Sequence, residues 1–298
     1  MLVFNLNIII KHSLEFKRRD NMSNFVTAEW LHEHCDDENL VIVDCRADLF
    51  DREYGKRLYE EGHIKNALFL DVKKDLAGEV EEHGGRSPLP ELSILRNKIE
   101  SLGISNDKTI IAYDEGALAG AERFWWMMKY LGHESVFILN GGINAWLSEG
   151  YELSSKVRDT RKGTFDIKVN EDIIISMTEV KSKLNKEEVA IVDSRAPERY
   201  RGEVEPIDKK AGHIPGAINY HWKDVLNEKS RFKPSQELKK HFEELEKYEE
   251  IILQCGSGID ACGNFVALDE IGFKPKLYVG SWSDWISYEN NPVVKGEN

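Results

Sequence analysis

The chain has 298 residues, of which 41% are hydrophobic and 31% are charged, and its formal net charge at pH 7 is −13. This length suits two domains of ordinary size, each with a core of its own. The acidic balance argues against binding to nucleic acids, because phosphate backbones are bound by clustered Lys and Arg side chains.

The first 22 residues differ in character from the rest of the chain. Their apolar stretch is too short to span a bilayer. The basic residues Lys17, Arg18 and Arg19 follow that stretch, whereas a secretory signal places its basic residues first. We expect residues 1–22 to be a disordered extension, or an upstream misassigned start with Met22 as the true initiator, and we expect no membrane association.

The next part of the chain alternates short β-branched runs with amphipathic stretches, which is typical of a parallel sheet covered by helices on both faces. Apolar residues at helical spacing predict a helix near residues 90–102. A further, largely apolar helix is predicted over 121–131, and another helix, carrying Trp146, follows Gly141 and Gly142. Strands are predicted over residues 40–44, 109–113 and 135–139.

The second half repeats this pattern. VIVDCR at 41–46 returns as AIVDSR at 190–195, GHIKNA at 62–67 as GHIPGA at 212–217, and IIAYDEG at 110–116 as IILQCGSG at 251–258. The three pairs are 149, 150 and 141 residues apart, so a duplicated domain explains them. The predicted elements are strands 190–193, 250–254 and 276–279 and helices 236–245 and 261–271, followed by Gly280 and Trp285.

The predicted fold class is therefore α/β, with two similar domains that each contain a parallel sheet. The stretch SSKVRDTRKG at 154–163 is polar and has no apolar periodicity, so it predicts a linker. We expect a first domain over 23–153, a linker over 154–171 and a second domain over 172–298.

The two copies differ at one informative position. The first copy ends an apolar strand on Asp114, whereas the second ends the matching strand on Cys255, followed by Gly256, Ser257 and Gly258. Glycines at a strand end before a helix let main-chain N–H groups form an anion-binding nest. We expect this nest to lower the pKa of the Cys255 thiol and to stabilise a thiolate or persulfide.

The number and spacing of the cysteines indicate that the other three have structural roles. The chain has four cysteines and no Cys-x-x-Cys pair, which argues against a disulfide scaffold and a structural zinc site and favours a reducing compartment such as the cytoplasm. Buried, inert packing fits Cys35 and Cys45 but fits Cys255 poorly. For Cys262, packing is preferred over a regulatory disulfide with Cys255. No metal or cofactor is expected.

Two further motifs flank the strand that ends at Asp193. Arg195 is expected to pair with Asp193 or with a neighbouring loop. His213 is mirrored by His63 in the copy without the cysteine, so both are expected to anchor turns. Arg199 has no counterpart in the first copy, which makes it a candidate clamp for a carboxylate or oxyanion, with a surface ion pair as the alternative.

Taken in order, AIVDSR, RYRGE, GHIPGA, CGSG and GSWSDW follow a copy that carries RFWW and LNGGINAW. Over residues 25–292 this arrangement resembles the tandem-domain rhodanese family of 3-mercaptopyruvate and thiosulfate sulfurtransferases. The CGSG loop is more similar to the mercaptopyruvate branch, since the thiosulfate branch places basic residues beside the cysteine. The resemblance implies an inactive first domain that lines one wall and a catalytic second domain.

The resemblance also implies a ping-pong reaction, in which Cys255 takes sulfur from a small anionic donor as a persulfide and passes it to cyanide, thioredoxin or another thiol. It implies that Arg199 grips the carboxylate of the donor and that Ser257 hydrogen-bonds the sulfur or the donor. The remaining loop residues matched to the family site are Gly256, Gly258, Ile259, Asp260 and Ala261.

Four positions depart from the family pattern. Ile207 follows Glu205-Pro206 where the mercaptopyruvate branch has a second donor-binding arginine. Ser87 and Lys73 stand where a proposed Ser-His-Asp relay has its His and Asp, and Asp260 stands where a neutral Thr is usual. These departures put the preferred donor and the relay in doubt and leave the persulfide chemistry in place.

Arg86, in GGRSPLP, is expected to add positive charge to the cleft. Trp282 is a candidate for a cleft wall, with a place in the core as the alternative.

Two alternative functions are considered for a cysteine in such a loop. A thiol phosphatase with a Cys-x5-Arg loop is disfavoured, because Ala261 occupies the Arg position and Asp260 would repel a phosphate. A catalytically weakened rhodanese that serves as a sulfur carrier or sensor remains an alternative. Turnover of mercaptopyruvate or thiosulfate with cyanide distinguishes that alternative from an enzyme.

Overall fold

The computed structural model describes residues 23–116 and 119–297. The predicted extension over 1–22 lies outside the described residues. In the first half, the described strands form one parallel sheet in the order β1-β5-β4-β2-β3. The strands are β1 (Phe25–Val26), β2 (Leu40–Asp44), β3 (Ala67–Phe69), β4 (Thr109–Tyr113) and β5 (Val136–Leu139). The helices are α2 (Ala28–His34), α3 (Tyr54–Glu61), α4 (Val72–Asp75), α5 (Leu92–Ser101), α6 (Gly120–Tyr130) and α7 (Gly142–Ser148).

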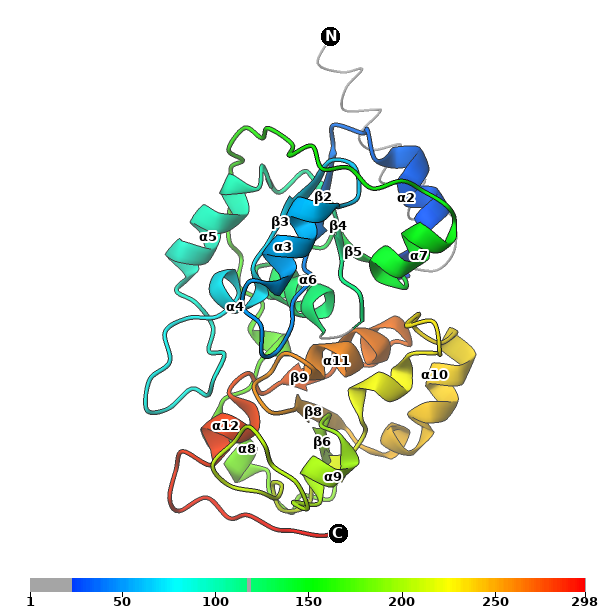
Figure 1. Ribbon diagram of the computed structural model, residues 1–298. Helices are drawn as coiled ribbons and strands as arrows, with labels where there is room; N and C mark the ends of the chain where they lie inside the picture. Colours follow the sequence, from blue (N-terminus) through cyan, green and yellow to red (C-terminus); the bar gives the residue numbers. More distant parts are fainter. Residues whose placement is uncertain (1–22, 117–118, 298) are drawn as a thin grey trace.

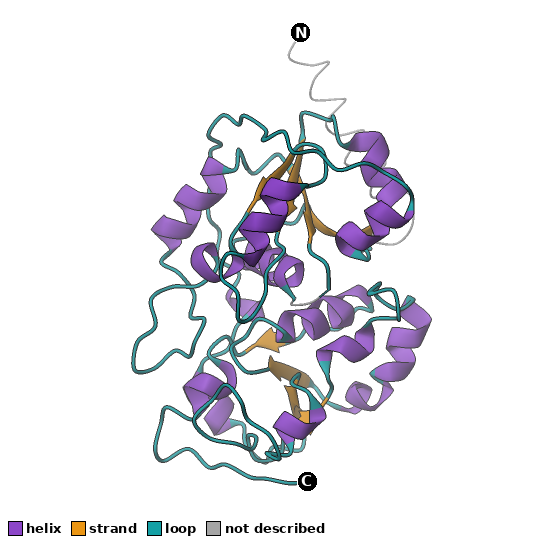
Figure 2. Cartoon of the chain, in the orientation of Figure 1, coloured by secondary structure: helices purple, strands orange, loops and turns teal. Residues whose placement is uncertain are grey.

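The second half contains another parallel sheet, in the order β7-β6-β8-β9. Its strands are β6 (Val189–Asp193), β7 (Ile218–Asn219), β8 (Glu250–Gln254) and β9 (Lys276–Leu277). The helices are α8 (Met177–Ser182), α9 (Pro197–Tyr200), α10 (Ser235–His241), α11 (Ala261–Glu270) and α12 (Ser281–Trp285), and short 3₁₀ turns are η1 (Glu171–Ile173), η2 (Trp222–Val225) and η3 (Glu243–Lys247). Figure 2 shows the two groups of strands, each surrounded by helices. The predicted α/β class with two parallel sheets is confirmed.

The duplication extends to the register of the strands. Asp44 at the end of β2 pairs with Tyr113 at the end of β4, and Asp193 at the end of β6 pairs with Gln254 at the end of β8. Asp114, which follows β4, and Cys255, which follows β8, therefore lie at equivalent places in their two sheets. This register puts the informative difference between the copies at equivalent sites.

Helices cover both faces of each sheet because the strands are apolar on both faces. In the first domain α5 and α6 pack on one face, and α2 and α7 pack on the other. Helices α6 and α11 also pack against each other (Figure 1). One apolar cluster therefore includes residues of both sheets. Trp125 and Trp126 of α6 both contact the Phe265 ring, with ring centroids 6.3 and 6.4 Å apart.

The helix predicted over 236–245 is wrong in its second half. Helix α10 ends at His241, and the 3₁₀ turn η3 follows. Phe242 and Leu245 are both fully buried and three residues apart. A 3₁₀ turn has three residues per turn, so it directs both side chains to the same core, which an α-helix does less well.

A segment of the first domain, residues 83–86, docks on helix α12 of the second and is called the docking segment below. The Gly84 N–H donates to Asp284 Oδ1 at 2.7 Å, and the Arg86 N–H donates to Ser283 Oγ at 3.0 Å. The His83 ring stacks on the Tyr288 ring, with centroids 3.9 Å apart. Among the helices of residues 23–116 and 119–297, none has the length and apolar character of a transmembrane span.

The tight approach at Gly85 generates a stability prediction. Gly85 has φ +83°, and a Cβ there would overlap the Gly280 carbonyl oxygen. Gly84 has φ +96°, but a Cβ there meets nothing nearer than 3.6 Å. Both Ala substitutions should incur the left-handed backbone strain of about 1–2 kcal/mol. Only Gly85→Ala should add overpacking of about 1–3 kcal/mol, measured as a lower free energy of unfolding in urea. Equal losses for the two variants would contradict this.

Candidate active site

The loop that carries the candidate thiol begins where strand β8 ends. Cys255 follows Gln254 at the carboxyl edge of the second sheet, which is where open α/β sheets bind ligands. Helix α12 fixes its backbone: the Cys255 N–H donates to Ser281 Oγ at 3.1 Å, and its carbonyl accepts the Trp282 N–H at 3.0 Å. The position of the thiol is therefore set by packing between a strand and a helix.

The residues after Cys255 surround its sulfur with main-chain N–H groups. The Gly258 N–H donates to Cys255 Sγ at 3.1 Å, and the N–H groups of Ser257 and Ala261 also favour the thiolate form. Gly258 has φ +77°, and a Cβ there would overlap the carbonyl oxygen of Val279. Glycine alone fits this position without strain, so the loop has the nest geometry expected from the sequence.

Burial affects this thiol more strongly than the main-chain amides do. Cys255 is 1% exposed, and burial raises the pKa of its thiol above the ordinary value. The Asp260 carboxylate raises that pKa further, and the N–H groups of the loop lower it without cancelling the rise. The expectation that the loop lowers the pKa of the resting thiol is therefore wrong in sign, because desolvation outweighs the amides.

Asp260 immediately precedes helix α11. Its Oδ1 is buried and has no hydrogen-bond partner in the described part of the chain. Burial raises the pKa of Asp260, and the positive charges of Arg199 and Lys223 oppose that rise, as does the Ala119 N–H of the first domain. The unusual acid noted in the sequence thus lies close enough to influence both the thiol and the arginine.

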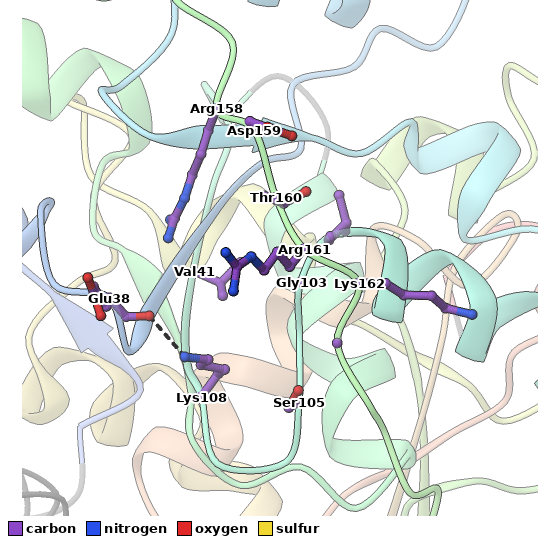
Figure 3. A pocket seen from close by; sticks show the side chains of 12 residues that line it. Glu38, Val41, Gly103, Ser105, Lys108, Arg158, Asp159, Thr160, Arg161 and Lys162 are labelled. Atoms are coloured by element: carbon purple, nitrogen blue, oxygen red, sulfur yellow. Dashed lines mark hydrogen bonds between the residues drawn. The ribbon is translucent and has the colours of Figure 1, made fainter. Parts of the chain in front are cut away.

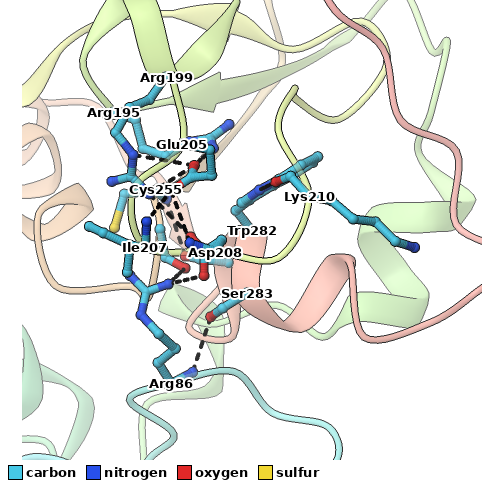
Figure 4. Close-up of polar contacts among 12 residues, drawn as sticks. Arg86, Arg195, Arg199, Glu205, Ile207, Asp208, Lys210, Cys255, Trp282 and Ser283 are labelled. Carbon is cyan, nitrogen blue, oxygen red and sulfur yellow. Dashed lines mark hydrogen bonds and ion pairs between the residues drawn. The ribbon is translucent and has the colours of Figure 1, made fainter. Parts of the chain in front are cut away.

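Two arginines from different domains lie near Gly256, the residue after Cys255. Figure 4 shows both arginines beside Asp208. Arg199 belongs to α9 of the second domain, and Arg86 belongs to the docking segment of the first. A Cβ built on Gly256 would lie 2.9 Å from Arg86 Nη2 and 3.5 Å from Arg199 Nη2. Arg86 Nη1 also lies 3.4 Å from the Gly256 carbonyl oxygen. The two arginines singled out in the sequence are thus neighbours in space.

Carboxylates already occupy both guanidiniums. Asp208 bridges them, since its Oδ1 accepts from Arg86 Nη1 and its Oδ2 accepts from Arg199 Nη2 at 3.1 Å. Glu205 accepts from Arg199 Nη2 at 2.8 Å and from Arg195 Nη1 at 3.4 Å. Sequence reasoning missed Asp208, for which the only signal was an acid three residues after Glu205 in EVEPID.

Arg123 of α6 reaches the same loop from the first domain. Its side chain is fully buried, and its Nη1 and Nη2 donate to the carbonyls of Gly258 at 3.1 Å and Ser87 at 3.3 Å. Its guanidinium carbon lies 5.4 Å from the centroid of the Trp126 ring. The RFWW motif was visible in the sequence, but the direction of Arg123 toward the second domain was not.

The first domain shows what the same loop holds when the cysteine is replaced. The Asp114 carboxyl accepts the N–H groups of Gly116, Gly120 and Ala121 at 2.8, 3.0 and 2.9 Å. Burial raises the pKa of Glu122, and the neighbouring Asp114 raises it further. The duplicated loop is therefore a binding site for an anionic group, and in the first copy the Asp114 side chain occupies it.

The remaining candidate residues from the sequence do not belong to the ion-pair cluster of Arg86, Arg199, Glu205 and Asp208. Trp282 is fully buried and donates from Nε1 to the Lys210 carbonyl at 2.9 Å, so it belongs to the core and its assignment to an open cleft wall is wrong. Ile259 is 6% exposed. Lys73 donates to the Leu49 carbonyl within the first domain, and Ser87 contributes its carbonyl to Arg123. The two relay positions thus make contacts of other kinds.

The histidines and Cys262 have structural surroundings. His63 Nδ1 lies 2.7 Å from the Tyr59 carbonyl and His213 Nδ1 lies 2.8 Å from the Tyr200 carbonyl, so both anchor turns as predicted. The Cys262 thiol donates to the Gly258 carbonyl at 3.3 Å, and burial raises its pKa to about 12. The predicted pairing of Arg195 with Asp193 is confirmed, with Nη2 to Oδ2 at 2.6 Å.

A separate pocket of about 270 Å³ lies between the first domain and the segment that follows it (Figure 3). Its lining includes the basic side chains of Lys108, Arg158, Arg161 and Lys162. Lys162 pairs with Glu100, and Arg158 donates to the Leu40 carbonyl at 3.2 Å. The lining residues do not include the Cys255 loop, so this pocket is not the sulfur site.

Comparisons with known proteins show the family of the chain. The family model for the rhodanese-like domain matches residues 27–149 and 176–288. The chain is 38% identical to a probable 3-mercaptopyruvate sulfurtransferase of Pseudomonas aeruginosa, over 92% of this chain and 99% of that protein. It is 33% identical to a putative thiosulfate sulfurtransferase, SseB, of Mycobacterium tuberculosis, over 86% of this chain and 90% of that protein.

The structure of the 3-mercaptopyruvate sulfurtransferase SseA from Escherichia coli is similar, with a TM-score of 0.78 and 32% identity, over 88% of this chain and 100% of that chain. The family model matches two regions, each of which contains one parallel sheet, and the Cys255 loop lies in the second of them. The chain belongs to the rhodanese-like family and contains two copies of its domain in tandem.

Proposed function

We propose that the protein is a sulfurtransferase that moves a sulfane sulfur from a small anionic donor, 3-mercaptopyruvate or thiosulfate, to cyanide or a thiol through a persulfide on Cys255. The observation that carries this proposal is the Cys255 sulfur, held in a loop of main-chain N–H groups beside two guanidiniums. The names of the similar proteins support the same reaction class.

The first half-reaction consumes the donor. The Cys255 thiolate attacks the sulfur of 3-mercaptopyruvate, the donor's carbon–sulfur bond breaks, and the electron pair leaves as the enolate of pyruvate, which takes up a proton. The sulfur remains as a persulfide, whose terminal atom is an anion at neutral pH. The amides around Cys255 Sγ are the groups placed to accept that charge.

The second half-reaction restores the enzyme. Cyanide or an acceptor thiolate attacks the outer sulfur, the sulfur–sulfur bond breaks, and Cys255 leaves as a thiolate. We propose thioredoxin as one such acceptor and the cytoplasm as the compartment. The support for a reducing compartment is that all four cysteines are free.

Arg199 is proposed to hold the anionic end of the donor. Its guanidinium is close to Gly256 and its side chain is 14% exposed, so it is accessible from the site. A planar fork binds a carboxylate bidentately, which suits mercaptopyruvate better than the tetrahedral end of thiosulfate. The uncharged side chains of Ser257 and Ile259 in the loop support the same preference.

A weakened enzyme that serves as a sulfur carrier is the alternative. The raised pKa of the Cys255 thiol and the carboxylates on both arginines favour slow turnover. Thiocyanate production from mercaptopyruvate or thiosulfate with cyanide separates the two functions. Catalytic turnover excludes the carrier alone, whereas a single stoichiometric transfer excludes the enzyme.

Cys255→Ser is expected to abolish sulfur transfer, because a hydroxyl cannot form the persulfide. The fold should be unchanged, because the Ser and Cys side chains are similar in size. Mass spectrometry of the donor-treated protein should find the mass of one added sulfur atom on the peptide with Cys255. Cys262→Ser is the matched control and should keep transfer. Full activity in Cys255→Ser would end the proposal.

Arg199→Ala is expected to raise the Michaelis constant for mercaptopyruvate by roughly ten- to a hundredfold, the loss of one charge-assisted contact of about 1.5–3 kcal/mol. Steady-state kinetics with varied donor measures this change. Arg201→Ala removes an arginine paired with the exposed Glu203 and should leave the constant unchanged. The same donor dependence in both variants would remove Arg199 from the donor site.

The sign of the pKa shift at Cys255 generates a pH prediction. Because this pKa is raised, the thiolate population and the rate of alkylation by iodoacetamide should still be rising at alkaline pH. Asp260→Asn removes a nearby negative charge, so its alkylation profile should move to lower pH. Asp269→Asn, near the opposite end of helix α11, should leave the profile in place. Peptide mass spectrometry assigns the rate to Cys255, and an unmoved profile in Asp260→Asn would contradict the assigned coupling.

A further inference from the structure

The Asp208 carboxylate has a position that the proposed mechanism leaves unexplained. It is 3% exposed, and its two oxygens each accept from a different guanidinium, Oδ1 from Arg86 and Oδ2 from Arg199. A single carboxylate thus joins the two domains beside Gly256. This is the bridging arrangement that two converging arginines offer to any carboxylate.

The neighbouring Glu205 shows what a structural carboxylate looks like in the same cluster. Glu205 Oε1 accepts the N–H groups of Ile207 and Asp208, both at 3.0 Å, and the side chain also accepts from Arg195 and Arg199. Although burial raises the pKa of Glu205, these hydrogen bonds lower it below its usual range. Glu205 is therefore bound by the loop that carries it.

Asp208 is held differently. Its hydrogen bonds in the described structure come from the two arginine side chains, and its own loop contributes no donor to it. Burial raises the pKa of Asp208 in spite of the charge of Arg86 and Arg199. The Asp208 carboxylate is thus held by the two arginine side chains and not by main-chain N–H groups of its own loop.

The cluster is also electrically balanced. Three guanidiniums face three carboxylates, with Arg195 on Asp193, and Arg199 and Arg86 on Glu205 and Asp208. A small anion that approaches Gly256 finds both nearby guanidiniums already paired. It gains a full charge-assisted contact only if one resident carboxylate leaves.

We infer that Asp208 occupies the place of the donor's carboxylate, and that Arg86 and Arg199 together receive that carboxylate when it displaces Asp208. This inference rests on the proposed function for the identity of the donor and extends the donor site to a residue of the first domain. The ligand class is a small α-keto carboxylate. Asp208 lowers the affinity for that anion by competing with it.

Arg86 is well placed for this role. Its main-chain N–H is fixed to Ser283 Oγ at 3.0 Å, so a side-chain substitution leaves the docking of the two domains in place. Its side chain is 30% exposed, which gives an anion access to the guanidinium. Arg86 is thus a specificity-determining residue on a rigid support.

The test measures binding, so that it is independent of sulfur transfer. Pyruvate, which carries the carboxylate and has no sulfur to give, is titrated into the full-length protein by calorimetry. Asp208→Asn should lower the dissociation constant for pyruvate by about fivefold or more, because a competing ion pair is removed. Arg86→Gln should raise it by a similar factor. Glu203→Gln and Arg201→Gln, which break an exposed pair in the same segment, are matched controls and should leave it unchanged.

The double variant Arg86→Gln/Asp208→Asn separates competition from positioning. If Asp208 competes, Asp208→Asn strengthens binding and the double variant binds more tightly than Arg86→Gln alone. If Asp208 only positions the arginines, Asp208→Asn weakens binding as Arg86→Gln does, and the inference is overturned. An unchanged constant in either single variant also overturns it.

Because the Asp208 side chain is buried, the Asp208→Asn variant can fail to fold, and a second measurement covers that outcome. Should it fail to fold, the wild-type protein and Arg86→Gln are compared with pyruvate and with the uncharged amide of pyruvate. Only the carboxylate should lose affinity in Arg86→Gln, and an equal loss for the amide overturns the inference. Failure of sulfur transfer with the expected binding changes would instead refute the proposed function alone.

Discussion

A charged sulfur in a nearly closed site is stable only if main-chain groups replace the water it has lost. Cys255 is 1% exposed, and a buried charge is costly unless it is hydrogen-bonded. The loop meets this requirement with the Gly258 N–H on the sulfur, which depends on a left-handed glycine packed against Val279. The strand end and the Ser281 contact then hold the backbone that presents these amides. Desolvation raises the pKa of the resting thiol, and the same exclusion of water limits hydrolysis of a persulfide.

The first domain separates the backbone of this site from its chemistry. Asp114 stands at the position of Cys255, and three main-chain N–H groups bind its carboxyl. Anion acceptance is thus a property of the duplicated strand–loop–helix unit, and the side chain at its first position decides what is accepted. A loop filled by its own carboxyl has no room for sulfur chemistry. The first domain instead contributes Arg86 and Arg123 to the loop of its partner domain.

Local sequence signals predicted those parts of the molecule that depend on local structure. Strands β2, β4 and β8 follow from apolar runs, with bounds that match the prediction for each. The duplicated motifs predicted two equivalent sheets, and the contrast between Asp114 and Cys255 identified the loop.

The predictions that failed concern features that depend on tertiary contacts. The sign of the pKa shift at Cys255 is set by its burial in the folded protein, which no local motif reports. Asp208 escaped notice because its partners, Arg86 and Arg199, are distant in sequence from each other. Trp282 was ambiguous for the same reason, since it is buried in an apolar cluster built from distant segments and donates to the Lys210 carbonyl.

Charge in this site is arranged across the boundary between the domains. In an acidic protein, each guanidinium near Gly256 is matched by a carboxylate, and Asp260 adds a further acid next to the thiol. Such a cluster does not attract anions at long range, so binding must come from exchange of partners at contact distance. Exchange requires guanidiniums that stay in place when their carboxylates leave. The docking segment provides this for Arg86, because Gly84 and the Arg86 N–H are fixed to helix α12 whatever the side chain binds. The interface between the two domains, one of which has Asp114 in place of the cysteine, is therefore itself a component of the site.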